Sequence, residues 1–220
     1  MDLQLARSNM TEQQVRPWDV LDQQVLDVLS EIPRETFVAS QYRGIAYSDF
    51  ELPIGHEQHM LKPTLDGRLL QSLLLSATDT ALEIGTGSGY LTTCLAQLCS
   101  HVDSIDNIAA LAETARIRLT EQGVANARIL HQDASVQWNS KTGYDAIAFS
   151  GSIMSVPDFY RQKLNLGGRL FAVIGEPTRP TMEAIVMTRV KDNEWSTESL
   201  FETRIEPLVN FVSESQSFVF

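Results

Sequence analysis

A glycine-rich turn near the middle of the chain has the residue types and spacing of a cofactor site. Residues 81–90 read A-L-E-I-G-T-G-S-G-Y, so an apolar, strand-like run enters a turn and a helix-like stretch follows. Glycines at such a turn let a ligand approach the backbone, because no Cβ stands in the way. Asp106 ends the next apolar run, 21 residues after Gly85, where an acidic side chain takes the hydroxyls of a ribose. The combination predicts a site for an adenosine-containing cofactor.

Two classes of cofactor compete for this turn. A dinucleotide turn reads G-x-G-x-x-G and sets a helix N-terminus against a pyrophosphate, whereas this turn reads G-x-G-x-G and continues with Tyr90. Glu83, just before the turn, would sit badly beside a pyrophosphate but suits a ligand with an ammonium and a sulfonium. We therefore predict S-adenosyl-L-methionine rather than NAD. The competing interpretation, that the glycines only make a tight strand–helix turn, is weakened by the spacing to Asp106.

Asp133 adds a third part to the expected site. It follows a third apolar run, so in this fold it would lie at the carboxyl edge of the sheet, near the adenine, and accept from the N6 amino group. The alternative is that Asp133 caps a short turn. The complete predicted cofactor-binding set is Glu83, Gly85, Thr86, Gly87, Ser88, Gly89, Tyr90, Asp106, Asn107, Asp133 and Ala134.

Short apolar runs alternate with helical patterns from residue 80 onward, which indicates βαβ units and a mostly parallel sheet. The expected strands are Thr80–Ile84, His101–Ile105, Ala127–Leu130, Ala146–Ser150 and Arg169–Ile174. The expected helices are Gly89–Cys99, Ile108–Gln122 and Pro157–Asn165, the last closed by Gly167 and Gly168 as a C-cap. Two further runs, Ala184–Val190 and Ser196–Thr203, predict a hairpin at an antiparallel edge.

The first 79 residues have a different pattern. Apolar residues recur at roughly helical spacing over Gln14–Glu31, and Asp22 is placed to cap the second half of this stretch. A second amphipathic helix is expected at about Leu65–Leu75, after a loop rich in His and Pro. The predicted organisation is one domain, 1–220, with an N-terminal helical and loop cap, 1–79, and a cofactor-binding α/β core, 80–220.

Composition limits the class of protein. The chain has 220 residues, 43% of them hydrophobic, and 17 Lys and Arg against 28 Asp and Glu, so its formal net charge is −11. This acidity argues against non-specific binding to nucleic acid. No membrane-length apolar run and no signal-peptide pattern occur, so we expect a cytoplasmic protein with no membrane partner. The cysteines and histidines lack a metal-ligand pattern, so no metal is expected.

Residues 82–90 closely resemble the cofactor motif of protein-L-isoaspartate (D-aspartate) O-methyltransferases. The family patterns V-P-R-E-x-F-V, L-P-I-G, F-D-A-I, G-G-x-L and R-F-V-P-L are matched in order by I-P-R-E-T-F-V, L-P-I-G, Y-D-A-I, G-G-R-L and R-I-E-P-L, between residues 32 and 208. The resemblance runs from about residue 10 to 210. It implies a Rossmann-like S-adenosyl-L-methionine-dependent methyltransferase fold, with a mostly parallel, doubly wound sheet, an antiparallel C-terminal edge and an N-terminal helical extension.

The resemblance also implies an activity and its partners. Members of the family methylate the carboxylate of L-isoaspartyl residues in damaged proteins, and the ester recloses to a succinimide that partly returns to aspartate. The implied partners are therefore isoaspartyl-containing peptides or proteins. Two alternatives stay open on the sequence: the same cofactor with a different acceptor, a small molecule or another protein group, and a non-catalytic cofactor-binding protein. The intact glycine turn argues against the second.

The loop after L-P-I-G departs from the family pattern. Where the family reads approximately x-G-Q-T-I-S-x-P, residues 56–63 read H-E-Q-H-M-L-K-P. By resemblance the catalytic loop residues are Gln58, His59 and Leu61, and Leu61 stands at the position of the active-site Ser. His59 could replace the lost donor or be a loop histidine without a role. A second departure, S-G-S-I for T-A-A-P, covers residues 150–153. The basic residues expected near the site are Arg16, Lys62 and Arg204.

Overall fold

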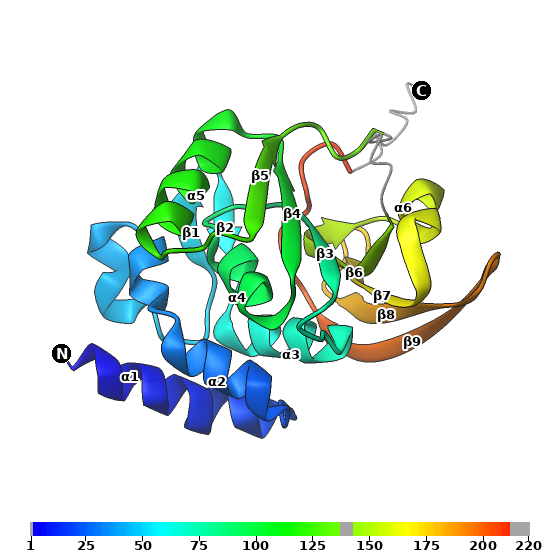
Figure 1. The fold of residues 1–220 in the computed structure, drawn as a ribbon. Coiled ribbons are helices and arrows are strands. Elements are labelled where there is room, and N and C mark those ends of the chain that lie inside the picture. The colour runs from blue at the N-terminus through cyan, green and yellow to red at the C-terminus, as the bar shows by residue number, and fades with distance from the viewer. Residues whose placement is uncertain (1, 137–142, 212–220) are drawn as a thin grey trace.

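A seven-stranded sheet forms the centre of the molecule (Figure 1). The computed structural model describes residues 2–136 and 143–211. The strand order is β5-β4-β3-β6-β7-β8-β9, with the first five strands parallel and β8 and β9 antiparallel at one edge. The strands are β3 Thr80–Ile84, β4 His101–Asp106, β5 Ala127–His131, β6 Tyr144–Ile153, β7 Leu164–Ile174, β8 Met182–Lys191 and β9 Glu194–Thr203. The predicted parallel strands, C-terminal hairpin and α/β class are confirmed.

Helices cover both faces of the sheet. On one face, α3 (Pro63–Leu73) and α4 (Tyr90–Leu98) share a core cluster with inward-facing residues of β3, β4, β6 and β7. On the other face, α6 (Asp158–Lys163) packs through Tyr160 against β6 and β7. The remaining helix of the core, α5 (Ala109–Glu121), lies along β4 and β5. The predicted helices after β3 and β4 are therefore confirmed.

The N-terminal segment is a series of short helices and a hairpin. These elements are α1 Leu3–Asn9, the π-helix η1 Met10–Val15, the 3-10 helix η2 Arg16–Trp18, α2 Gln23–Glu31, the 3-10 helices η3 Arg34–Phe37 and η4 Ser40–Ile45, and the strands β1 Leu52–Gly55 and β2 Gln58–Met60. The hairpin β1–β2 forms its own two-stranded sheet within the stretch expected to be a loop. The boundary predicted between cap and core falls directly before β3, and the single-domain organisation stays a prediction.

The stretch of helical period over residues 14–31 is divided between the end of η1, η2 and α2, and α2 is the helix expected after Asp22. Asp19 adopts a left-handed conformation, with φ 59°, and ends η2. The following backbone amides of Leu21 and Asp22 donate to Oε1 of Gln71, at 2.6 and 2.9 Å, instead of to a preceding turn. Asp22 then caps α2 through its side chain, which accepts from the amides of Gln24 and Val25, as predicted.

The prediction that Gly167 and Gly168 form the C-cap of α6 is wrong. α6 ends at Lys163, and Leu164 is already extended and paired with Tyr144. Four residues, 165–168, bulge before pairing resumes, because Arg169 is the next residue to face Ala146. A Cβ on Gly168 would lie 2.9–3.1 Å from three backbone carbonyl oxygens. The glycines therefore serve a bulge at the start of β7 and do not cap the helix.

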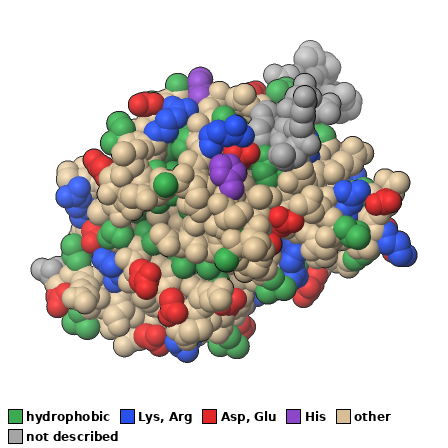
Figure 2. Space-filling model, in the orientation of Figure 1, with side chains coloured by type: hydrophobic (Ala, Val, Ile, Leu, Met, Phe, Trp, Pro, Cys, Tyr) green, Lys and Arg blue, Asp and Glu red, His purple; other side chains and the backbone are tan. Residues whose placement is uncertain are grey.

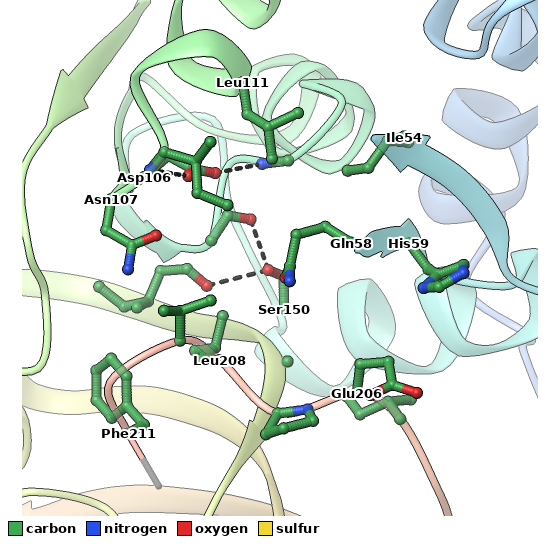
Figure 3. Close-up of a pocket in the computed structure, with 18 of the residues that line it drawn as sticks. Ile54, Gln58, His59, Asp106, Asn107, Leu111, Ser150, Glu206, Leu208 and Phe211 are labelled. Carbon is green, nitrogen blue, oxygen red and sulfur yellow. Dashed lines mark hydrogen bonds between the residues drawn. The ribbon is translucent and has the colours of Figure 1, made fainter. Parts of the chain in front are cut away.

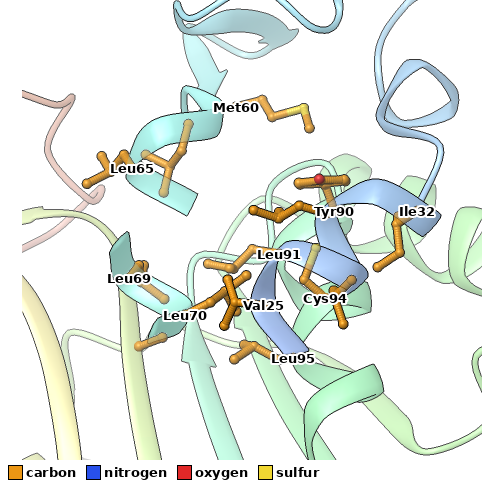
Figure 4. Packing of buried hydrophobic residues seen from close by; sticks show 14 of the residues in the cluster. Val25, Ile32, Met60, Leu65, Leu69, Leu70, Tyr90, Leu91, Cys94 and Leu95 are labelled. Atoms are coloured by element: carbon orange, nitrogen blue, oxygen red, sulfur yellow. The ribbon is translucent and has the colours of Figure 1, made fainter. Parts of the chain in front are cut away.

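Apolar residues of α2, α3 and α4 form the core beneath the N-terminal segment (Figure 4). Within this core, the fully buried Arg34 donates from Nη1 to Oδ2 of Asp66 at 2.6 Å and from Nε to the carbonyl of Ala46 at 2.9 Å. Its Nη2 donates to the carbonyl of Leu61. Arg34 therefore joins η3, α3 and the end of the hairpin in one hydrogen-bonded group.

The molecular surface mixes acidic and basic side chains. Both kinds are scattered over the face in Figure 2, so on that face the acidic excess is not gathered in one patch. Over residues 2–136 and 143–211, no helix is long and apolar enough to cross a membrane.

Candidate active site

A cleft opens at the carboxyl ends of the parallel strands. It lies where the chain leaves β3 for one half of the sheet and β6 begins the other half, which is the usual ligand position in open α/β sheets. Figure 3 places Asp106, Asn107 and Leu111 at one end and His59 and Glu206 at the other, with Ser150 between them. Eight predicted site residues line the cleft: Gln58, His59, Leu61, Gly85, Gly87, Asp106, Asn107 and Ala134.

The glycine turn needs its glycines for close contacts on two sides. Gly85 has φ +94°, and a Cβ there would collide with Oγ of Ser150 and lie 2.8 Å from Leu208, in the throat of the cleft. Gly89 has φ +85°, and its Cβ would lie 2.9 Å from Leu119 on α5. Glycine at position 85 therefore keeps the cleft open between its two ends. Glycine at position 89 lets the start of α4 pack closely against α5.

Asp106 fixes the glycine turn at one end of the cleft. Its Oδ2 accepts from the amide of Gly87 and its Oδ1 from the amide of Ile108, both at 2.8 Å (Figure 3). Burial raises the pKa of Asp106, and these two hydrogen bonds act against that rise. Each oxygen keeps a second lone pair for a ligand hydroxyl. The predicted position of Asp106 at the end of β4 is confirmed.

Three predicted residues of the turn direct their side chains into the protein. Oγ1 of Thr86 hydrogen-bonds Oγ of Ser104 at 2.6 Å, and Oγ of Ser88 accepts from the amide of Tyr90 at 3.2 Å. The ring of Tyr90 lies under the guanidinium of Arg34, 4.7 Å from its centroid. None of these three residues lines the cleft, but all three line a smaller chamber behind the glycine turn. Their role toward a cofactor stays a prediction.

Glu83 is a buried carboxylate with one unused oxygen. Its Oε2 accepts from Oγ of Ser104 at 2.6 Å and from Oγ1 of Thr92, whereas Oε1 is buried without a partner among the described residues. Burial raises its pKa to about 8. Glu83 lines a smaller chamber behind the glycine turn, which shares Gly85, Gly87 and Ser150 with the cleft. An orphaned acceptor next to an open glycine cradle fits a ligand that carries a cation.

Asp133 lies at the carboxyl end of β5, as predicted, but its side chain is exposed and outside the lining of the cleft. Its Oδ1 accepts from the amide of Ser135 at 2.9 Å, which is the turn-capping alternative. Its Oδ2 accepts from Nδ2 of Asn210 at 2.8 Å. Contact of Asp133 with an adenine therefore stays a prediction, while the neighbouring Ala134 lines the cleft.

The β1–β2 hairpin brings the loop that differs from the family pattern, residues 56–63, to the cleft. His56 and Glu57 form its turn with positive φ angles of 54° and 59°, which fit a tight two-residue hairpin connection. Gln58, His59 and Leu61 then face the cleft, and the Leu61 side chain is 8% exposed. Because Arg34 holds the Leu61 carbonyl, the backbone at this position is fixed and only the side chain distinguishes it from a serine.

Ser150 and the C-terminal segment were not predicted as site residues. Oγ of Ser150 donates to the carbonyl of Gly85 at 2.5 Å and to that of Ile84 at 3.1 Å, at the middle of the cleft. Residues 205–209 and 211 line the same cleft. They are held by the Ser152 amide, which donates to the Glu206 carbonyl at 2.9 Å, and by the Leu208 amide, which donates to the Ser152 carbonyl at 3.0 Å. The departure at residues 150–153 was the available signal for Ser150, and the match at residues 204–208 was the signal for the C-terminal segment.

The basic residues expected near the site do not line the cleft. Arg16 pairs with Glu12 at 2.9 Å, and Arg204 donates to the carbonyls of Pro177 and Arg179. The ammonium of Lys62 lies 5.2 Å from the centre of the Trp18 ring. Among the residues that the structure describes, no group of three His, Cys, Asp or Glu side chains could hold a metal ion.

The fold and the cleft together define the class of Rossmann-like, S-adenosyl-L-methionine-dependent methyltransferases. A sequence profile described as protein-L-isoaspartate(D-aspartate) O-methyltransferase matches residues 6–213. The chain belongs to this family.

Relatives and solved structures agree with that assignment. A protein-L-isoaspartate O-methyltransferase of Syntrophotalea carbinolica is 35% identical over 209 residues, covering 95% of each chain. One of Rhodopseudomonas palustris is 33% identical over 200 residues, covering 91% of each chain. A Plasmodium falciparum chain described as a protein-L-isoaspartate O-methyltransferase, in complex with S-adenosyl-L-homocysteine, shares the fold with a TM-score of 0.78 at 19% identity, over 92% of this chain and 97% of its own.

Proposed function

We propose that this chain transfers the methyl group of S-adenosyl-L-methionine to the carboxylate of L-isoaspartyl residues in peptides and proteins. The observation that carries the proposal is the family match over residues 6–213, with the Gly85–Asp106 cradle intact at the carboxyl edge of the sheet. The alternatives of a small-molecule acceptor and of a non-catalytic protein gain no support from the relatives, which are named for isoaspartyl methylation.

The residues present fit the proposed cofactor. Asp106 offers its free lone pairs to ribose hydroxyls, and the apolar Ile105, Ile108 and Leu111 offer a wall for the adenine. Glu83 offers its unpaired Oε1 to the cationic part of the molecule. A pyrophosphate brings no cation to that carboxyl group, so the same residues fit NAD poorly.

The chemistry needs positioning more than proton transfer. When bound, S-adenosyl-L-methionine supplies a methyl carbon already activated by its sulfonium. A carboxylate acceptor has an unperturbed pKa near 4, so it is ionised at neutral pH and needs no general base. The oxygen–methyl bond forms as the sulfur–methyl bond breaks, and the sulfur keeps the electron pair. The residues of the cleft therefore contribute alignment, which gives up to about 7–11 kcal/mol in well-oriented systems.

The acceptor carboxylate must be held without the serine of the family pattern. Leu61 offers no donor, and a lost hydrogen bond to a charged group costs about 1.5–3 kcal/mol. Gln58 and His59 line the same end of the cleft and carry N–H donors, while the hydroxyl of Ser150 lies at its centre. We assign Gln58 and His59 to orienting the acceptor, with Leu61 as an apolar wall.

An assay with radiolabelled S-adenosyl-L-methionine tests the function. An isoaspartyl peptide is compared with its aspartyl twin, which has the same composition and charge. We expect label in the isoaspartyl peptide only. Label in neither peptide, from a protein that binds S-adenosyl-L-methionine in calorimetry, would refute the proposed acceptor.

A further inference from the structure

Two carboxylates at the acceptor end of the cleft have no task in the transfer itself. Glu51 lies directly before β1 and Glu206 lies on the C-terminal segment, and both line the cleft. They are close enough for the charge of Glu206 to raise the pKa of Glu51, together with burial. Within residues 2–136 and 143–211, neither side chain forms a hydrogen bond or an ion pair with another residue. Their negative charge therefore faces the space that an acceptor would enter.

Positive charge at this end is sparse. Among the described residues that line the cleft there is no Lys and no Arg, and His59 is the one titratable base. His59 and Lys62 both act to lower the pKa of Glu51. The ammonium of Lys62 lies over the Trp18 ring, however, and Lys62 does not line the cleft. An acceptor that brings only a carboxylate would thus enter a region with an excess of negative charge.

The residue changes in the loop at 56–63 and in the C-terminal segment both disfavour an acceptor that brings only a carboxylate. Leu61 removes a hydroxyl donor that could hold a carboxylate, and Glu206 puts a charge where the family pattern R-F-V-P-L has a valine. A cationic side chain next to the reacting carboxylate would offset both changes, because the cation would meet Glu51 and Glu206 while Gln58 and His59 orient the carboxylate.

We propose that Glu51 and Glu206 make this cleft select isoaspartyl acceptors that carry Lys or Arg beside the isoaspartyl residue. This inference rests on the proposed function. Glu51 and Glu206 are specificity-determining residues: they touch the flanking cation, and the transferred methyl group goes to the isoaspartyl carboxylate in every case.

Three isoaspartyl peptides of one length test the proposal. They differ only in the residues on both sides of the isoaspartyl position, which are Lys, Gln or Glu. At low ionic strength we expect kcat/KM to fall in that order, with about a tenfold difference between the Lys and Glu peptides. The difference should shrink at high salt, because partly exposed charges are screened.

Variants assign the preference to the two carboxylates. In the double variant Glu51→Gln with Glu206→Gln, we expect the ratio between the Lys and Glu peptides to fall to about twofold or less. Glu198→Gln with Glu202→Gln is the matched control, because it also removes two negative charges, at exposed positions on β9 that do not line the cleft, and should keep the wild-type ratio.

The outcomes separate this inference from the proposed function. Equal rates on the three peptides, or a preference that persists in the double variant, overturn the inference while the methylation activity stands. Methylation of none of the peptides by a protein that binds S-adenosyl-L-methionine overturns the proposed function, and the inference with it.

Discussion

In the proposed function, single residues divide the cleft into a cofactor end and an acceptor end. Asp106 belongs to the first, because its carboxylate holds the amides of Gly87 and Ile108 and retains lone pairs for a ligand. Glu51 and Glu206 belong to the second. Ser150 stands between them and hydrogen-bonds the carbonyl of Gly85. A substitution at either end should therefore affect the binding of one substrate more than that of the other.

Asp106→Ala should weaken binding of S-adenosyl-L-methionine by about 1–3 kcal/mol, because the hydrogen bonds of a charged acceptor are lost. Isothermal titration calorimetry measures the change. Asp192→Ala, in the exposed turn between β8 and β9, is the control and should leave the affinity unaltered. An Asp106→Ala protein that is folded by circular dichroism and binds the cofactor as tightly as the wild type would contradict the role given to Asp106.

The buried carboxyl of Glu83 should make stability depend on pH. Its folded-state pKa, about 8, lies above the ordinary value of 4.5 because of burial, so the folded chain holds the proton more tightly than the unfolded chain. The contribution of this group is complete below pH 4.5 and is lost as the pH rises through 8. Without cofactor, Tm should therefore fall as the pH rises from about 5 to about 8.

Glu83→Gln isolates this effect, since glutamine resembles the protonated acid. The variant should show a smaller fall in Tm over the same pH range. It should also bind S-adenosyl-L-methionine more weakly, because glutamine cannot ionise to pair with the cation. Differential scanning calorimetry and titration calorimetry measure the two quantities. The same pH slope in both proteins would show that Glu83 is not the group that titrates.

At the scale of elements, the β1–β2 hairpin carries the residues that should decide how well an acceptor is held. Replacing Leu61→Ser restores the hydroxyl at the serine position of the family pattern and leaves His59 in place. We expect kcat/KM on an isoaspartyl peptide with neutral neighbours to rise about 10- to 150-fold, the equivalent of a charged hydrogen bond of 1.5–3 kcal/mol. Leu61→Ala is the control, since it removes bulk without adding a donor. An increase of the same size in Leu61→Ala would assign the effect to space instead.

The buried Arg34 group connects that hairpin to the core. Arg34→Ala would leave Asp66 buried without its partner and free the carbonyls of Ala46 and Leu61, so we expect a loss of about 3–5 kcal/mol in the free energy of unfolding. Urea denaturation measures it. Arg179→Ala, which breaks an exposed pair with Glu176, should cost about 1 kcal/mol or less. Equal losses in the two variants would contradict this assignment.

At the scale of the whole molecule, the sequence predicts the α/β core better than the N-terminal segment. The strands and helices from residue 80 onward follow local periodicity and turn residues, which act over a few positions. The hairpin turn at His56 and Glu57 has neither Gly nor Asn, although both residues take positive φ, so it gives little local signal. The break at Asp19 depends on Gln71, about fifty residues later, which no local pattern contains.

The same distinction holds for the site. Gly85, Gly87 and Asp106 could be predicted because one strand–turn–helix unit and its neighbour fix their spacing. Ser150 and the C-terminal segment reach the cleft only through tertiary pairing, such as the contact between Ser152 and Pro207. The expectation that Arg204 lies near the site was wrong, because its guanidinium turns to the carbonyls of Pro177 and Arg179.

The most direct test of the central claim is a competition measured by mass spectrometry. A 1:1 mixture of an isoaspartyl peptide and its aspartyl twin, both with Lys beside the variable position, is incubated with the protein and S-adenosyl-L-methionine. We predict that the isoaspartyl peptide alone gains a methyl group, and that Asp106→Ala slows this gain at a limiting cofactor concentration. Methylation of both peptides alike, or of neither, would contradict the claim that this cleft is an isoaspartyl methyltransferase site.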